Sequence, residues 1–254
     1  MTTTHNLASP IVFALDFPNI GSARTAANEV KSAVGMLKIG LELFVEAGRE
    51  AMQMGEETGL PLFLDLKLHD IPVTVERAVA RAGALGARIL TVHAAGGPEM
   101  LQRAVRRAEA DGNGLQITAI TLLTSLDKSD LARLGVEASP AEYVRNIAKM
   151  AFESGVKSFV CSPHEVAALR QSLGETVQLI APGVRADGAG GDDDQKRTMT
   201  ASEAIANGAD WVVVGRPIRD ASDRLAAASA IRESCRAAQQ QRQETRQETL
   251  LRQR

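Results

Sequence analysis

The 254-residue sequence has little of several features that mark specialised proteins. Its only cysteines, Cys161 and Cys235, lie far apart, so no disulfide framework is expected and a reducing, cytoplasmic setting is predicted. A formal net charge of −2 excludes the polybasic surface typical of nucleic-acid binding. No stretch approaches the roughly 18 apolar residues of a membrane span, and residues 1–6 lack a signal-peptide pattern. A small polar ligand is therefore expected, with no nucleic acid and no membrane as partner.

Histidine is also scarce. His5, His69, His93 and His164 form no recognisable metal-ligand cluster. A histidine-based metal site is therefore not expected. Carboxylates also bind divalent cations, so metal chemistry stays open on composition alone.

The chain alternates short apolar runs with longer amphipathic, Ala-rich segments, the βα alternation of a parallel sheet. Hydrophobic residues make up 44% of it, enough for a sizeable core. The expected strands are Ile11–Leu15, Met36–Ile39, Leu60–Leu64, Arg88–Val92, Gln116–Ile120, Ser158–Cys161, Val177–Ala181 and Trp211–Val214. The expected helices are Ser22–Ser32, Val73–Gly83, Pro98–Ala110, Pro140–Glu153, His164–Ser172 and Thr200–Asn207.

This alternation predicts an α/β fold, a single-domain (β/α)8 TIM barrel over residues 1–238. An open doubly wound sheet of similar length usually has fewer strands, and no Pro- or Ser-rich linker divides the chain. Residues 239–254 are almost entirely Gln, Arg, Glu and Thr. We expect this tail to extend the final helix or to be disordered.

The most informative stretch is Asp65-Leu66-Lys67-Leu68-His69-Asp70-Ile71-Pro72, directly after a predicted buried strand. Because strand side chains alternate, Asp65 and Lys67 are expected on one face at the strand's end. Asp70 is expected in the first turn of the next helix, near the positive end of its dipole. The plain alternative is a structural ion pair.

Other polar residues also cluster at the ends of predicted strands, where a barrel enzyme keeps its site. Lys38 lies inside an apolar strand, and a buried ammonium requires a nearby carboxylate, which Asp65 or Asp70 could supply. His93 at a strand end is more often structural. The remaining strand-end residues are Asp16, Thr124, Ser125, Arg185 and Arg216.

Two motifs near the end of the chain indicate a phosphate site. Ala181-Pro182-Gly183-Val184-Arg185 and Val213-Val214-Gly215-Arg216-Pro217-Ile218 both place Gly and Arg directly after a strand. Barrels commonly bind phosphate after these last strands, through backbone N–H groups and charge-assisted bonds. The Gly- and Asp-rich segment 187–195 between them suits a lid, or else a plain solvated loop.

Taken together, these motifs resemble the shorter bacterial type of the orotidine 5'-phosphate decarboxylase family. The resemblance covers most of residues 10–220. It is carried by Ala14-Leu15-Asp16, Leu37-Lys38-Ile39-Gly40, the block Asp65 to Thr74, His93-Ala94-Ala95-Gly96-Gly97, Leu123-Thr124-Ser125, Pro182-Gly183-Val184-Arg185, Asp194-Gln195 and Val214-Gly215-Arg216-Pro217. It implies a homodimeric barrel that converts orotidine 5'-phosphate to UMP and CO2 without any metal or organic cofactor.

The resemblance also implies roles for individual residues. Lys67 would protonate the pyrimidine carbon that loses CO2, within a charge array formed by Lys38, Asp65, Lys67 and Asp70. Asp70, Ile71 and Thr74 would reach into the partner subunit's site. The substrate would be held at the ribose by Asp16 and Lys38, at the pyrimidine by Thr124, and at the phosphate by Gln195, Gly215 and Arg216, with Arg185 assisting.

Two other functions fit parts of this pattern. A Mg²⁺-dependent sugar-phosphate lyase of related barrel type, a 3-keto-gulonate-phosphate decarboxylase or a hexulose-phosphate synthase, shares the Asp-x-Lys-x-x-Asp pattern. Ile71-Pro72 and Thr74 point away from it. A catalytically dead barrel that only binds nucleotide is the other, and the intact Lys67 and both aspartates argue against it.

Overall fold

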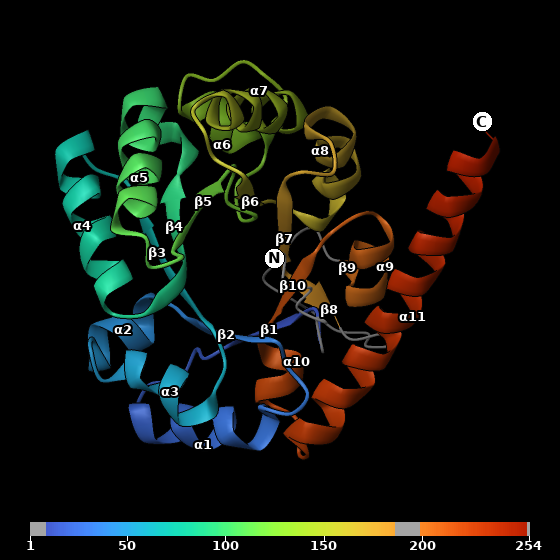
Figure 1. Cartoon of the computed structure of the whole chain (residues 1–254). Helices are drawn as coiled ribbons and strands as arrows, with labels where there is room; N and C mark the ends of the chain where they lie inside the picture. The colour runs from blue at the N-terminus through green and yellow to red at the C-terminus, as the bar shows by residue number, and fades with distance from the viewer. Residues whose placement is uncertain (1–8, 186–198, 253–254) are drawn as a thin grey trace.

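The computed structural model describes residues 9–185 and 199–252. In this part of the chain, parallel strands close into a barrel with the order β1-β10-β7-β6-β5-β4-β3-β2 (Figure 1). The barrel strands are β1 (Ile11–Ala14), β2 (Met36–Ile39), β3 (Leu62–Leu68), β4 (Ala87–His93), β5 (Gln116–Ile120), β6 (Ser158–Val160), β7 (Gln178–Pro182) and β10 (Trp211–Val214). The predicted (β/α)8 barrel is confirmed.

Helices surround the barrel on its outer side (Figure 1). They are α1 (Ile20–Val30), α2 (Leu41–Ala47), α3 (Met54–Thr58), α4 (Pro72–Ala84), α5 (Gly97–Asp111), α6 (Lys128–Arg133), α7 (Pro140–Glu153), α8 (Val166–Leu173), α9 (Ala201–Ala206), α10 (Arg216–Arg219) and α11 (Arg224–Arg252). Short 3-10 turns η1 (Ala51–Gln53), η2 (Ala94–Gly96) and η3 (Pro163–Glu165) and a small parallel pair, β8 (Val184–Arg185) with β9 (Met199–Thr200), complete the described elements. None of the described helices is long and apolar enough to cross a membrane.

Helix starts are encoded locally. Ser139 precedes Pro140 at the start of α7, and its side chain accepts from the Glu142 backbone N–H while the Glu142 side chain bonds back. Helix α4 likewise begins at a proline, Pro72. The first turn of α4 therefore starts after Asp70, which lies outside the helix and not in its first turn as expected.

Two features differ from the expected elements. The third strand runs to Leu68 and not only to Leu64, so Asp65 and Lys67 lie at the end of β3, as expected. The short helices α2, α3, α6 and α10 were not expected, because four to seven residues are too few to show a helical period. Helix α11 continues through the polar segment to Arg252 and rises away from the barrel (Figure 1).

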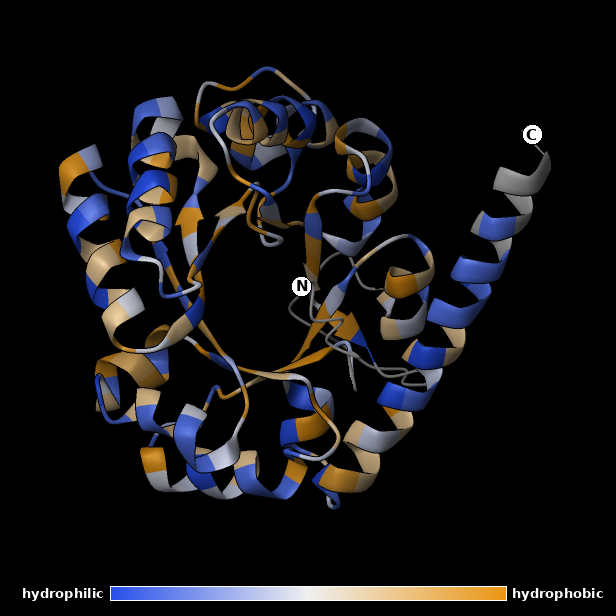
Figure 2. Cartoon of the chain, in the orientation of Figure 1, coloured by the Kyte–Doolittle hydropathy of each residue, from blue (hydrophilic) through white to orange (hydrophobic). Residues whose placement is uncertain are grey.

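Strand alternation sends successive residues of β3 to opposite faces of the barrel wall. Leu62 and Leu64 belong to the main core between strands and helices, whereas Phe63 belongs to a separate cluster inside the barrel. Figure 2 shows the hydrophobic residues concentrated along the strands. The inner cluster comprises Val12, Ala14, Met36, Phe63, Ile89, Ile180, Trp211 and Val213.

This inner cluster fills the barrel and fixes where its polar residues lie. Two residues beyond Met36, Phe63 and Ile89, the same inward face carries Lys38, Asp65 and Thr91. All three of these polar residues are buried. On three neighbouring strands the inward face thus changes from apolar to polar toward the carboxyl end, and the site rests on a hydrophobic floor.

Candidate active site

Two adjoining cavities open at this end of the barrel. The first encloses about 140 Å³ and the second about 360 Å³, and both are lined by Lys38, Asp65, Pro182 and Val213. The first continues over Phe63, Lys67, Ile120, Leu122, Leu123, Thr124, Val160 and Cys161. The second continues over Ala14, Asp16, Gly183, Val184, Gly215, Arg216, Pro217 and Arg219. The first cavity is largely apolar and the second is rich in charge and glycine.

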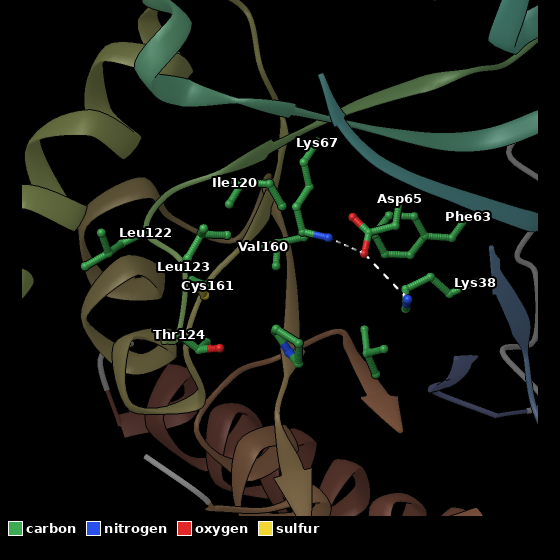
Figure 3. Close-up of a pocket in the computed structure, with 12 residues that line it drawn as sticks. Lys38, Phe63, Asp65, Lys67, Ile120, Leu122, Leu123, Thr124, Val160 and Cys161 are labelled. Atoms are coloured by element: carbon green, nitrogen blue, oxygen red, sulfur yellow. Dashed lines mark hydrogen bonds and ion pairs between the residues drawn. The ribbon is translucent and has the colours of Figure 1, made fainter. Parts of the chain in front are cut away.

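Four side chains of alternating charge run along the boundary between the cavities. Lys67 Nζ lies 2.8 Å from Asp65 Oδ2, and Lys38 Nζ lies 3.6 Å from the same oxygen. Lys38 Nζ also lies 3.2 Å from Asp16 Oδ1. Figure 3 shows Lys38 and Lys67 pointing toward Asp65 from either side. The carboxylates that offset Lys38 are therefore Asp65, one of the two expected partners, and Asp16, which was not expected in this role.

Asp65 is held in its charged form. Burial alone would raise the pKa of its carboxyl group, but the charges of Lys38 and Lys67 and the hydrogen bonds from Lys67 and Thr91 oppose burial. Their combined effect lowers the pKa of Asp65 below its ordinary value. The side chains of Lys38 and Asp65 are each only 11% exposed, so this ion pair is shielded from solvent. Removing either ammonium would leave a buried charge without its partner, which is costly.

The backbone around Lys67 is irregular. The pairing of β3 with β4 shifts between Leu64, opposite Leu90, and Leu68, opposite Val92, so extra β3 residues bulge from the ladder. Among the described residues, Lys67 is the one non-glycine residue with a positive φ, at 51°. A left-handed backbone costs such a residue about 1–2 kcal/mol. Asp65 and Lys67 were expected to share a face of a regular strand. They do contact each other, but through a bulge and not through regular alternation.

Thr91 was not picked out from the sequence. It lies on β4 opposite this bulge and is fully buried. Its Oγ1 donates to Asp65 Oδ1 at 2.9 Å and accepts from the Lys67 backbone N–H at 2.8 Å. The available signal was its position two residues before His93, on the inward face of a predicted strand.

His93 also faces this cluster, from the carboxyl end of β4. Its ring lies against His69, with 5.4 Å between ring centroids. Burial lowers the pKa of His93, and the neighbouring His69 and Lys67 lower it further, against an opposing effect of Asp65. The neutral ring is therefore the favoured form beside Lys67.

The wall of the first cavity contains a cysteine, Cys161. Burial raises the pKa of the Cys161 thiol, so the cavity wall there presents a neutral thiol and not a nucleophilic thiolate. In residues 9–185 and 199–252, no group of three or more His, Cys, Asp or Glu side chains is placed to hold a metal ion.

The second cavity holds two of the four residues expected at a phosphate. Gly215 and Arg216 line it, as does Arg219, which sequence reasoning missed. Arg219 donates from Nη1 to the Asp16 carbonyl at 3.3 Å and is fixed by Asp220 at 2.7 and 2.9 Å. Arg219 is the last residue of the four-residue helix α10, which is too short to show a helical period, so nothing in the sequence indicated that it approaches Asp16.

The remaining predicted residues fall into three groups. Thr124 lines the first cavity, across from Lys38 in Figure 3. Arg185 is half-buried on β8, directly after Val184, which lines the second cavity. Gln195 and the expected lid segment 187–195 lie outside the described residues.

Asp70, Ile71 and Thr74 are exposed at the start of α4 and line neither cavity. Asp70 Oδ1 accepts from the Ile71 backbone N–H at 2.6 Å. Among the ion pairs of the described residues, none joins Asp70 to Lys38 or Lys67. Asp70 therefore does not offset Lys38 within one chain, contrary to one of the two expectations.

Comparison with known proteins was decisive for the family. A sequence model described as "Orotidine 5'-phosphate decarboxylase / HUMPS family" matches residues 9–231. The chain belongs to the orotidine 5'-phosphate decarboxylase / HUMPS family. An orotidine 5'-phosphate decarboxylase from Anaeromyxobacter sp. (strain K) is 50% identical over 87% of this chain and 96% of its own.

Members of the orotidine 5'-phosphate decarboxylase / HUMPS family at lower identity also match this chain. The orotidine 5'-phosphate decarboxylase of Neisseria meningitidis (strain FAM18) is 40% identical over 86% of this chain and 89% of its own. Among solved structures, the orotidine 5'-phosphate decarboxylase of Lactobacillus acidophilus aligns with a TM-score of 0.77 and 32% identity. That alignment covers 89% of this chain and 99% of the Lactobacillus chain.

We predict that His93 makes stability depend on pH. Because its folded pKa lies below the ordinary value of 6.5, the unfolded chain takes up a proton first as the pH falls. The free energy of unfolding should therefore decline below about pH 6.5 until the folded His93 also titrates. Urea unfolding at fixed protein concentration measures this slope.

His93→Gln should flatten the slope, whereas the same change at the exposed His164 should leave it as it is. An equal slope in wild type and His93→Gln would contradict the prediction.

Proposed function

We propose that this chain decarboxylates orotidine 5'-phosphate to UMP and CO2, without a metal or organic cofactor, and that Lys67 protonates the ring carbon that loses CO2. The observation that carries this proposal is the buried, charged Asp65 held between Lys38 and Lys67 at the junction of an apolar and a polar cavity. Membership of the family supports the choice of reaction.

The two cavities match the two halves of a nucleotide. Apolar walls such as Ile120 and Val160 suit the faces of a flat pyrimidine, and Thr124 offers a hydroxyl to its edge. Arg216 and Arg219 suit a phosphate, and Gly215 exposes backbone close to it. Lys38, which lines both cavities, and Asp16, which lines the second, would hold the ribose hydroxyls. Gln195 would also hold the phosphate, with Arg185 assisting.

The charge array fits the chemistry of the decarboxylation step. The bond between ring carbon and carboxylate breaks, CO2 departs, and the electron pair stays on the ring carbon until that carbon takes a proton. Stabilising this negative charge requires a positive group fixed in advance in a water-poor site. The Lys67 ammonium, held by Asp65 at 2.8 Å, supplies both the positive charge and the proton.

Asp65 has a second effect in this proposal. Its negative charge lies where the substrate carboxylate would approach, and repulsion between the two disfavours the bound substrate more than the transition state. Lys38, shared between Asp65 and Asp16, holds both carboxylates in place.

We also propose that two copies of the chain form a homodimer with shared active sites. Large apolar side chains are exposed on α2 and at the start of α4, the helices that follow the neighbouring strands β2 and β3. They are Leu41, Val45, Ile71 and Val73, with Val45 82% and Ile71 63% exposed. Burying this surface against a second copy would carry Asp70 and Thr74 of one chain toward the partner's site.

Purified protein should convert orotidine 5'-phosphate to UMP, followed as a loss of substrate absorbance, at the same rate with and without EDTA. Lys67→Ala should lower turnover by at least about 10³-fold, because it removes both the charge and the proton donor. Lys67→Ala should still bind UMP, and Lys149→Ala, at an exposed lysine of α7, should retain full activity.

The outcomes separate the alternatives. No conversion by folded protein, with EDTA-sensitive turnover of a keto-sugar phosphate, would replace this proposal with a Mg²⁺-dependent lyase. UMP binding without turnover would indicate a binding protein. Near-normal turnover by Lys67→Ala would remove Lys67 from its role.

Mixing two inactive variants tests the shared site. In a heterodimer of Lys67→Ala and Asp70→Ala chains, one site carries both substitutions and the other carries neither. Random pairing of equal amounts should therefore restore about a quarter of wild-type activity. Mixing Lys67→Ala with a Lys67→Ala, Asp70→Ala double variant is the control and should restore none. No recovery, with heterodimers confirmed by native mass spectrometry, would contradict sharing.

A further inference from the structure

We infer that Thr91 is a positioning residue for this chemistry, one hydroxyl that fixes both the Asp65 carboxylate and the backbone of Lys67. The inference rests on the proposed function, which uses Asp65 and Lys67 but assigns nothing to Thr91. Thr91 lines neither cavity and need not touch a substrate.

The need for such a residue arises from the β3 bulge. Leu64 pairs with Leu90 and Leu68 pairs with Val92, so the β3 residues between them face Thr91 alone on β4. A bulge disrupts the regular ladder and leaves backbone groups to find other partners. The Lys67 N–H finds the Thr91 hydroxyl at 2.8 Å.

The same hydroxyl completes the coordination of Asp65. Its proton goes to Asp65 Oδ1 at 2.9 Å, while Asp65 Oδ2 faces the ammonium groups. A hydroxyl has one proton to donate and lone pairs to accept, so Thr91 makes both bonds at once. Each carboxylate oxygen of Asp65 thereby has a fixed partner, and the carboxylate cannot rotate without breaking a buried bond.

This arrangement links backbone to chemistry. The positive φ of Lys67 determines where its side chain leaves the strand, and the Thr91 bond to the Lys67 N–H holds that conformation. Placing an ammonium and a carboxylate for reaction is sensitive to shifts of about 1 Å. Thr91 therefore acts through both groups without contacting the reacting atoms.

The barrel offers a closely matched control. Thr118 on β5 is paired directly with Thr91 in the sheet, is equally buried and also uses its hydroxyl, which donates to Ser158 Oγ at 2.9 Å. It makes no bond to Asp65 or Lys67. Thr→Val at either position removes one buried hydroxyl with almost no change of shape, so only the bonding partners differ.

The test compares Thr91→Val, Thr91→Ser and Thr118→Val in the full-length protein. Thr91→Val should lower kcat on the order of 10- to 100-fold, whereas Thr91→Ser and Thr118→Val should stay within about threefold of wild type. Calorimetry should give one UMP bound per chain in all three variants. A loss of activity could then not be explained by a loss of folded protein.

The fall of kcat/KM at low pH, its acid limb, tests the role of Thr91 further. A residue with a purely structural role would not change the pH at which this fall occurs. Removing the Thr91 hydrogen bond raises the pKa of Asp65, so the limb should shift to higher pH in Thr91→Val and not in Thr118→Val. The other charged or titratable groups that face Asp65 are Lys38 on β2, Lys67 on β3 and His93 on β4, and all three are unchanged in these variants.

Amide hydrogen exchange of ¹⁵N-lysine-labelled protein tests the hydrogen bond between the Lys67 backbone N–H and Thr91 without an activity measurement. The Lys67 amide should exchange faster in Thr91→Val than in wild type or Thr118→Val, even if orotidine 5'-phosphate proves not to be the substrate. Unchanged Lys67 exchange, or a kcat loss in Thr118→Val as large as in Thr91→Val, would overturn the inference. No turnover by wild type with altered Lys67 exchange would instead count against the proposed function alone.

Discussion

Asp65 shares one carboxylate oxygen between two ammonium groups, Lys67 Nζ at 2.8 Å and Lys38 Nζ at 3.6 Å. Without that charge, the two positive groups would face each other in a partly buried site, at a high cost. With it, the ammonium groups are fixed before any ligand arrives. Fixed charge in a water-poor site is what stabilises charge that develops during a reaction, so the proposed chemistry depends on Asp65 staying ionised.

The barrel supplies the conditions for that ion pair. Inward residues such as Phe63 and Ile89 fill the interior with apolar side chains, and the polar residues follow two positions later on the same strands. Closure of the sheet brings β2, β3 and β4 side by side, so that Lys38, Asp65 and Thr91 meet although they are distant in sequence. The same floor keeps water out and strengthens each electrostatic contact.

The barrel could be predicted because its signal is repeated, with every strand an apolar run and most helices an amphipathic segment. The contact of Asp65 with Lys67 was expected from strand alternation, which places residues two apart on one face, although in the structure a bulge makes that contact. The bulge at Lys67 was not predictable, because it arises from a register shift between strands that a single strand does not encode. The hydrogen bonds of Thr91 depend on that bulge, so the sequence did not indicate them either. Asp70 was expected as one of two possible partners of Lys38 because it was placed in the first turn of the helix after β3, but α4 begins at Pro72, and Asp70 lies exposed before it.

The most direct test of this account is the titration of the Asp65 carboxyl group, followed by NMR in protein labelled with ¹³C at the aspartate carboxyls and assigned by the loss of one resonance in Asp65→Asn. The account predicts a pKa for Asp65 below the ordinary value of 3.8, because two ammonium groups and the Thr91 hydroxyl outweigh burial. A pKa at or above 3.8 would mean that burial outweighs the two ammonium groups and the Thr91 hydroxyl, and would contradict the account.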